Sequence, residues 1–172
     1  MNNIYLEKFI WNQENPFDKY PNLQDIWEPD LFIIAKEAID ESKERFLEGC
    51  DEGEVFLIKD DKKVIGITGY FPYEETYSHF FLRWHGILPE YQKLGISKKI
   101  IETIIQYLEK NYDNFSTIKE FMPIRESYKK TEEYFLKIGF KKIGEPEVVD
   151  WSKDLWQNFE YQLPQKKLRN HI

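Results

Sequence analysis

The chain has 172 residues with a net charge of −7, and 41% of its residues are hydrophobic. The length predicts one domain with its own core, and the hydrophobic share excludes an intrinsically disordered protein. The acidic balance disfavours nucleic acid as the main partner, and there is no apolar run long enough to span a membrane.

The start of the chain lacks the basic and apolar layout of a signal peptide, so we expect a cytoplasmic protein without a membrane partner. The sequence has one cysteine, Cys50, which excludes an internal disulfide and fits a reducing compartment. We interpret Cys50 as a bystander thiol.

Apolar periodicity and turn residues predict seven strands and about four helices in alternation. The expected strands cover residues 4–10, 54–58, 64–70, 78–88, 117–122, 140–143 and 158–163. The first main helix is expected to be capped by Asp30 and to end at Gly49, with Phe46 and Leu47 extending its buried face. Later helices are expected from Ile96 and before Gly139.

The segment between the long fourth strand and the following helix predicts an anion site. Pro89 has no N–H to donate and therefore ends the strand, while Gly95 permits a tight turn and a close approach to the backbone. A strand, a glycine-containing loop and a helix start gather free N–H groups at the positive end of the helix dipole. Such a cluster suits phosphate oxygens.

Two motifs carry a family resemblance. Gln92-x-x-Gly95-x-Ser97, just after Pro89-Glu90, resembles the pyrophosphate-binding motif of the GNAT N-acetyltransferase superfamily, Arg/Gln-x-x-Gly-x-Gly/Ala. Ser97 departs from that pattern, but it is small and could itself donate to a phosphate. Leu136-Lys137-Ile138-Gly139-Phe140 resembles the family's Tyr-x-Lys-x-Gly-Phe element, in which a helix leads into the next strand.

The resemblance implies an α/β (α+β) GNAT fold, with a mixed central sheet of about six or seven strands flanked by about four helices. We expect a single domain over residues 1–164 and a basic tail over residues 165–172. The implied reaction transfers an acetyl group from acetyl-CoA, with no metal, to an amine of a small molecule or protein. A non-catalytic acyl-CoA-binding module of the same fold is the alternative. The family often pairs as homodimers, and the oligomeric state stays open.

The resemblance also implies which residues contact the cofactor. Most belong to the loop and its flanks, where the backbone of Ile87 is expected to stabilise the thioester oxygen. The implied cofactor residues are Ile87, Leu88, Gln92, Lys93, Leu94, Gly95, Ile96, Ser97, Lys98 and Phe135.

The sequence offers several candidates for the proton-transfer residues. As base we consider His85, whose ordinary pKa lies near working pH, and Glu75 with its neighbour Glu74, while His79 is a weaker candidate. A structural histidine and plain surface carboxylates are the alternative interpretations.

The family's acid, a tyrosine that faces the leaving thiolate, falls at Phe135, which has no hydroxyl. Tyr128 on the same predicted helix face, or else Tyr134, is then expected to act as acid. Departure of the thiolate without an acid is the alternative.

Overall fold

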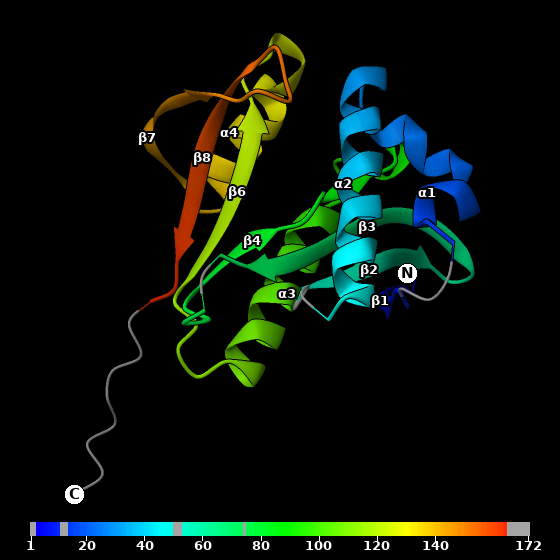
Figure 1. The fold of residues 1–172 in the computed structure, drawn as a ribbon, viewed down its shortest axis with the longest axis horizontal. Helices are drawn as coiled ribbons and strands as arrows, with labels where there is room; N and C mark the ends of the chain where they lie inside the picture. The colour runs from blue at the N-terminus through cyan, green and yellow to red at the C-terminus, as the bar shows by residue number, and fades with distance from the viewer. Residues whose placement is uncertain (1–2, 11–13, 50–52, 74, 165–172) are drawn as a thin grey trace, which may run out of the picture. The chain divides into compact units, whose positions relative to one another are not determined.

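A computed structural model describes residues 3–10, 14–49, 53–73 and 75–164. The strands are β1 (Ile4–Lys8), β2 (Glu54–Asp60), β3 (Lys63–Pro72), β4 (His79–Leu82), β5 (Gly86–Ile87), β6 (Thr117–Pro123), β7 (Lys141–Val148) and β8 (Leu155–Gln162). The helices are α1 (Pro16–Lys19), α2 (Pro29–Leu47), α3 (Ile96–Asn111) and α4 (Lys129–Lys137), with 3₁₀ turns η1 (Pro21–Ile26), η2 (Pro89–Tyr91) and η3 (Glu126–Tyr128). The predicted mixed α/β fold is confirmed (Figure 1).

The chain divides into two compact units. Unit 1 comprises Met1–Pro72 and Leu82–Asn111, and unit 2 comprises Tyr73–Phe81 and Tyr112–Ile172. The predicted cofactor loop therefore lies in unit 1, whereas α4 with its tyrosines lies in unit 2.

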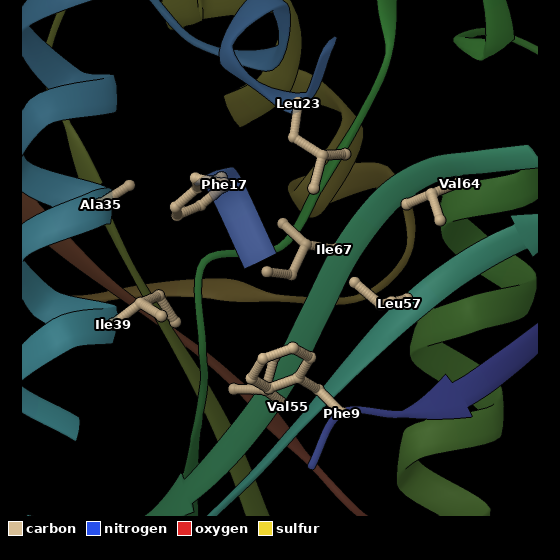
Figure 2. Close-up of a cluster of buried hydrophobic side chains, with 9 residues drawn as sticks. All are labelled: Phe9, Phe17, Leu23, Ala35, Ile39, Val55, Leu57, Val64 and Ile67. Carbon is tan, nitrogen blue, oxygen red and sulfur yellow. The ribbon is translucent and has the colours of Figure 1, made fainter. Parts of the chain in front are cut away.

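Unit 1 is a sheet with helices on both faces. β1, β2 and β3 are antiparallel neighbours, and β5 pairs with β3 so that Gly66 lies opposite Ile87. One face packs against α2 and the segments before it, in a core of nine buried residues drawn in Figure 2. The other face packs against α3, through Ile58 and Ile65 of the sheet and Ile100 of the helix. This packing holds the start of α3 beside the end of β5.

The first main helix corrects two expectations. Asp30 does not cap α2: Glu28 occupies the N-cap position and Pro29 follows as the first helical residue. Proline is favoured there because the N–H that it lacks would have no partner inside the helix. Phe46 and Leu47 are 43% and 65% exposed, because the buried stripe of α2 ends at Ile39 and the last two turns contribute nothing to the core.

The expected strand over residues 78–88 is wrong as one continuous element. It is split into β4 and β5, because Trp84 has a positive φ of 44°, which an extended strand cannot accommodate. The split raises the number of strands in the described residues from the expected seven to eight.

Unit 2 is built on β4, β6, β8 and β7. β4 runs parallel to β6, while β8 is antiparallel to both β6 and β7. α4 packs onto one face of this sheet through Phe135, whose ring lies edge-on to that of Phe140 with 4.9 Å between the ring centroids. The ring of Phe140 in turn lies next to that of Tyr161 of β8, with 5.6 Å between the centroids. The helix ends as predicted, with Gly139 at a φ of 108°.

Candidate functional site

The loop between β5 and α3 exposes its backbone. Lys93 and Gly95 both have left-handed backbone conformations, with φ of 65° and 73°. A Cβ built on Gly95 would meet no atom within 4 Å, so the space beside this glycine is open. Gln92 braces the loop from inside, because its side-chain amide donates to the carbonyl oxygen of Ile87 at 3.0 Å. The loop is therefore an ordered turn with room next to its backbone.

The start of α3 completes a cradle for an anion. The first N–H groups of any helix have no partner within the helix, and they lie at the positive end of its dipole. Lys98 and Lys99 add positive charge in the first turn, although Lys98 also pairs with Glu102 at 3.8 Å. The chemistry of this donor set fits a phosphate or diphosphate group.

Glycine is required at the start of β5 by close packing. A Cβ on Gly86 would lie 2.9 Å from Cζ2 of Trp27 and closer still to Ile26. η1 and the residue after it therefore approach the backbone of β5 more closely than any other side chain at position 86 would allow. This contact holds Ile87 in place beside the loop.

The backbone of Ile87 points its N–H away from β3. Leu88 donates its N–H to the carbonyl of Ile65 at 2.9 Å, so the Gly66–Ile87 pair is the non-hydrogen-bonded kind in this antiparallel ladder. The N–H of Ile87 then faces the side of β5 opposite to β3. Its carbonyl is already engaged by Gln92. The arrangement leaves one backbone donor for a ligand at the point where β5 ends.

His85 lies in the break between β4 and β5 and bridges two hydroxyl groups. Its Nδ1 lies 3.0 Å from Oγ1 of Thr68 on β3, and its Nε2 lies 2.5 Å from Oγ of Ser97 on α3. Burial lowers the pKa of His85 from 6.5 to about 4, so the ring is neutral near pH 7. The sequence left open whether His85 faces the core or a cleft, and the structure places it inside this hydrogen-bonded chain.

Unit 2 positions the predicted tyrosines at α4. Tyr128 is the N-cap of the helix and is half-buried, while Tyr134 lies one residue before Phe135, with its hydroxyl buried. Phe135 is 3% exposed and packs against Phe140. Phe135 therefore belongs to the core of unit 2.

Glu120 is a partly buried residue, with one carboxyl oxygen shielded from solvent, that the sequence analysis did not single out. One of its oxygens accepts from the N–H of Phe121 at 3.2 Å, and the other has no hydrogen-bond partner among the described residues. Burial raises the pKa of Glu120 to about 8, against the smaller lowering by the Phe121 N–H. The signal was available, because Glu120 falls between Ile118 and Met122 in the apolar register of its strand.

The remaining base candidates are not brought together by the structure. Glu75 is exposed in a turn, and Nδ1 of His79 lies 2.8 Å from the hydroxyl of Ser78. Glu74, Cys50 and the tail over residues 165–172 lie outside the described residues.

Neither a metal site nor a membrane span is found where the chain is described. Over residues 3–10, 14–49, 53–73 and 75–164, no group of three His, Cys, Asp or Glu side chains could hold a metal ion. In the same part of the chain, no helix has the length and apolar character that crossing a membrane requires.

Comparison with known proteins identifies the family. The sequence pattern of the Acetyltransferase (GNAT) family matches residues 11–140, which include the loop, His85 and α4. The chain belongs to the GNAT acetyltransferase family. Among curated proteins, no relative matches it.

Solved GNAT structures share the fold of this chain at low sequence identity. A GNAT-family protein from Desulfovibrio desulfuricans has a TM-score of 0.72 at 14% identity, over 93% of this chain and 99% of that one. A GNAT family acetyltransferase from Elizabethkingia anophelis, solved with acetyl-CoA bound, has a TM-score of 0.66 at 15% identity, over 95% and 100%. A mutant spermidine N-acetyltransferase from Vibrio cholerae has a TM-score of 0.64 at 15% identity, over 92% and 93%. At these identities the likeness establishes the GNAT fold alone.

The sequence analysis also missed Thr68, which lies on β3 and contacts His85. This residue is fully buried in β3 and holds His85 from the side opposite to Ser97. A threonine inside an apolar strand carries no local signal of such a role, because threonine is a common strand residue.

Proposed function

We propose that this protein is an acetyl-CoA-dependent N-acetyltransferase that transfers an acetyl group to an amine of a small molecule or protein, by direct attack in a ternary complex. The observation that supports the proposal is the loop between β5 and α3, in which two left-handed residues and a helix start form an open anion cradle. The solved relative from Elizabethkingia anophelis, whose structure holds acetyl-CoA, supports the choice of cofactor.

The residues present fit the diphosphate of acetyl-CoA. Backbone N–H groups from Lys93 to Lys98 would hold the phosphate oxygens, and the open space beside Gly95 would admit them. Acetyl-CoA, when bound, supplies the thioester carbonyl that the amine attacks. We propose the following cofactor-binding residues in the loop and its flanks: Ile87, Leu88, Gln92, Lys93, Leu94, Gly95, Ile96, Ser97 and Lys98. Phe135 was also expected to contact acetyl-CoA, but its side chain is buried against Phe140, and Phe135 is therefore left out of this set.

The N–H of Ile87 is our proposed donor to the thioester oxygen. Charge develops on this oxygen in the transition state, and a fixed backbone donor stabilises it without reorganisation. The proposal is supported by the direction of this N–H, away from β3, and by the close packing of Gly86 beneath η1 and Trp27.

The proposed reaction also needs residues that transfer protons. A lysine-like amine has a pKa of about 10.4 and must lose a proton before it attacks. His85 is a weak base, since its pKa is about 4 and hydroxyl groups lie within hydrogen-bond distance of both ring nitrogens. Glu75 is in solvent and could act through water. For the acid we propose Tyr128 at the start of α4, with Tyr134 as the second candidate, and substitution of each by Phe separates them through kcat at saturating acetyl-CoA.

A binding-only module of the same fold is the second candidate. The observations that favour it are the low pKa of His85 and the absence of a hydroxyl at Phe135. Such a protein would bind acetyl-CoA without releasing CoA in the presence of any amine. The two candidates therefore differ in turnover and agree in binding.

The loop is tested by titration calorimetry with acetyl-CoA on the parent, Gly95→Val and Gly49→Val. Both glycines have positive φ and open space at the Cβ position, so both substitutions impose backbone strain of about 1–2 kcal/mol. We expect Gly95→Val to lose binding and Gly49→Val to retain it. Equal affinity in all three proteins would overturn the loop assignment. Release of free CoA in a panel of amines, with spermidine included, then separates the enzyme from the binding module.

A further inference from the structure

Three side chains from separate segments of unit 1 form one hydrogen-bonded chain that ends at the cofactor loop. Thr68 lies on β3, His85 lies in the break before β5, and Ser97 lies in the first turn of α3. The Thr68–His85 and His85–Ser97 distances are 3.0 Å and 2.5 Å. The chain connects the interior of the sheet to the helix start that the anion cradle uses.

The direction of the hydrogen bonds follows from the burial of Thr68. Its side chain is fully buried, and within the described residues His85 Nδ1 is the one hydrogen-bond partner of its hydroxyl. If Nδ1 carried the ring proton, it would donate to Thr68, and the hydroxyl proton of Thr68 would be left without an acceptor in the core. A buried donor without a partner is costly. Thr68 therefore donates to Nδ1.

The neutral ring then carries its proton on Nε2. Burial holds the pKa of His85 at about 4, so the imidazole has a single N–H at neutral pH. With Nδ1 as acceptor, Nε2–H donates to the hydroxyl oxygen of Ser97 at 2.5 Å. The oxygen of Ser97 therefore accepts the hydrogen bond from His85, and the Ser97 hydroxyl proton points away from the imidazole ring. Ser97 is only partly buried and lies two residues after Gly95, in the first turn of α3.

We propose that Thr68 and His85 are positioning residues that hold Ser97 as a hydrogen-bond donor to the diphosphate of acetyl-CoA. The proposal rests on the proposed function, since it takes the loop as the diphosphate site. Neither Thr68 nor His85 touches the cofactor in this scheme; they act by orienting the hydroxyl of Ser97. A hydrogen bond to a charged group is stronger than one between neutral groups, so the orientation should be measurable as affinity.

The direction of the hydrogen bonds from Thr68 to Ser97 is tested first, on the protein without acetyl-CoA. Long-range proton–nitrogen NMR spectra of ¹⁵N-histidine-labelled protein distinguish the two tautomers, and the sequence has three histidines, so His85→Gln assigns the signal. We expect the Nε2–H tautomer at pH 7. The Nδ1–H tautomer would overturn the proposal. This measurement is independent of acetyl-CoA binding.

The effect on binding is tested with Ser97→Ala, Thr68→Val, Thr68→Ser and the double variant Thr68→Val with Ser97→Ala. We expect Ser97→Ala to weaken acetyl-CoA binding about tenfold and Thr68→Val to weaken it by a smaller factor. Thr68→Ser keeps the donor and should bind like the parent. The double variant should bind acetyl-CoA like Ser97→Ala alone, because Thr68 and His85 affect binding only through Ser97. Acetylpantetheine, which lacks the diphosphate, should bind all of the variants equally.

The outcomes separate this inference from the function that it rests on. A parent that fails to bind acetyl-CoA overturns the proposed function. A parent that binds, together with a Thr68→Val variant of equal affinity, overturns the inference and leaves the function standing. Additive losses in the double variant would assign Thr68 a structural role and overturn the inference as well. If Thr68→Val does not fold, Ser97→Ala and the tautomer measurement still decide it.

Discussion

His85 is a partly buried titratable residue whose neutral form is favoured in the folded state. Its folded pKa of about 4 lies below the unfolded value of 6.5, so the unfolded chain binds more protons between these values. The contribution of neutral His85 to the free energy of unfolding is therefore fully present above pH 6.5 and is lost as the pH falls toward 4. We expect the free energy of unfolding to fall by about 3 kcal/mol across this window because of His85. Urea titrations of the parent and of His85→Gln at fixed pH measure this contribution as the difference between the two proteins, and equal slopes against pH would contradict the assignment.

Glu120 behaves in the opposite way, because burial favours its protonated form. Its pKa rises from 4.5 to about 8 on folding, so the folded chain holds a proton that the unfolded chain has lost. Its contribution to stability is therefore present at low pH and is lost as the pH rises from 4.5 to 8. We expect Glu120→Gln to raise the free energy of unfolding at pH 8 by on the order of 4 kcal/mol. An unchanged unfolding midpoint at pH 8 would contradict the buried state of the carboxyl.

At the scale of elements, the pairing of β5 separates the proposed catalytic role of Ile87 from its role in folding. Its N–H makes no ladder bond to β3, whereas the N–H of Leu88 bonds to Ile65. We expect Ile87→Pro to lose turnover by on the order of 10²-fold or more, with a much smaller loss of acetyl-CoA affinity. Leu88→Pro removes a ladder bond and should lower stability instead. Calorimetry and CoA release measure the two effects, and an active Ile87→Pro enzyme would exclude the proposed donor.

For the whole molecule, His85 and Glu120 lie in different units and titrate in overlapping ranges. Between pH 4.5 and 6.5, His85 makes stability rise with pH while Glu120 makes it fall, so their contributions cancel in the parent. Removal of either group should therefore make the effect of the other on the pH dependence of stability measurable. We expect the slope of stability against pH to be lower than the parent's in His85→Gln and higher in Glu120→Gln. Urea titrations of the three proteins test this, and slopes displaced to the same side would contradict it.

Much of the fold, and the backbone of the loop between β5 and α3, could be predicted because their signals are local in the chain. Pro89 ends a strand, Gly95 adopts positive φ, and the apolar spacing after Ile96 forms a helix, whatever the rest of the molecule does. The same holds for Gly139 at the end of α4. The exact start of α2 was predicted wrongly, because Asp30 and Pro29 are both signals for a helix start and the helix begins at Pro29 with Glu28 as its cap.

The hydrogen-bonded chain could not be predicted, because it depends on how distant segments meet. Thr68 and Ser97 lie 17 and 12 residues from His85 in sequence. They meet because Trp84 breaks the strand at a positive φ and because β5 pairs with β3 in one register. No local propensity encodes a register, since many side chains must be buried together before one pairing is favoured over another. The backbone of the loop follows from the local sequence. The neutral state of His85 and its hydrogen bond to Ser97 depend on burial and on contacts between distant segments, which arise only in the folded protein.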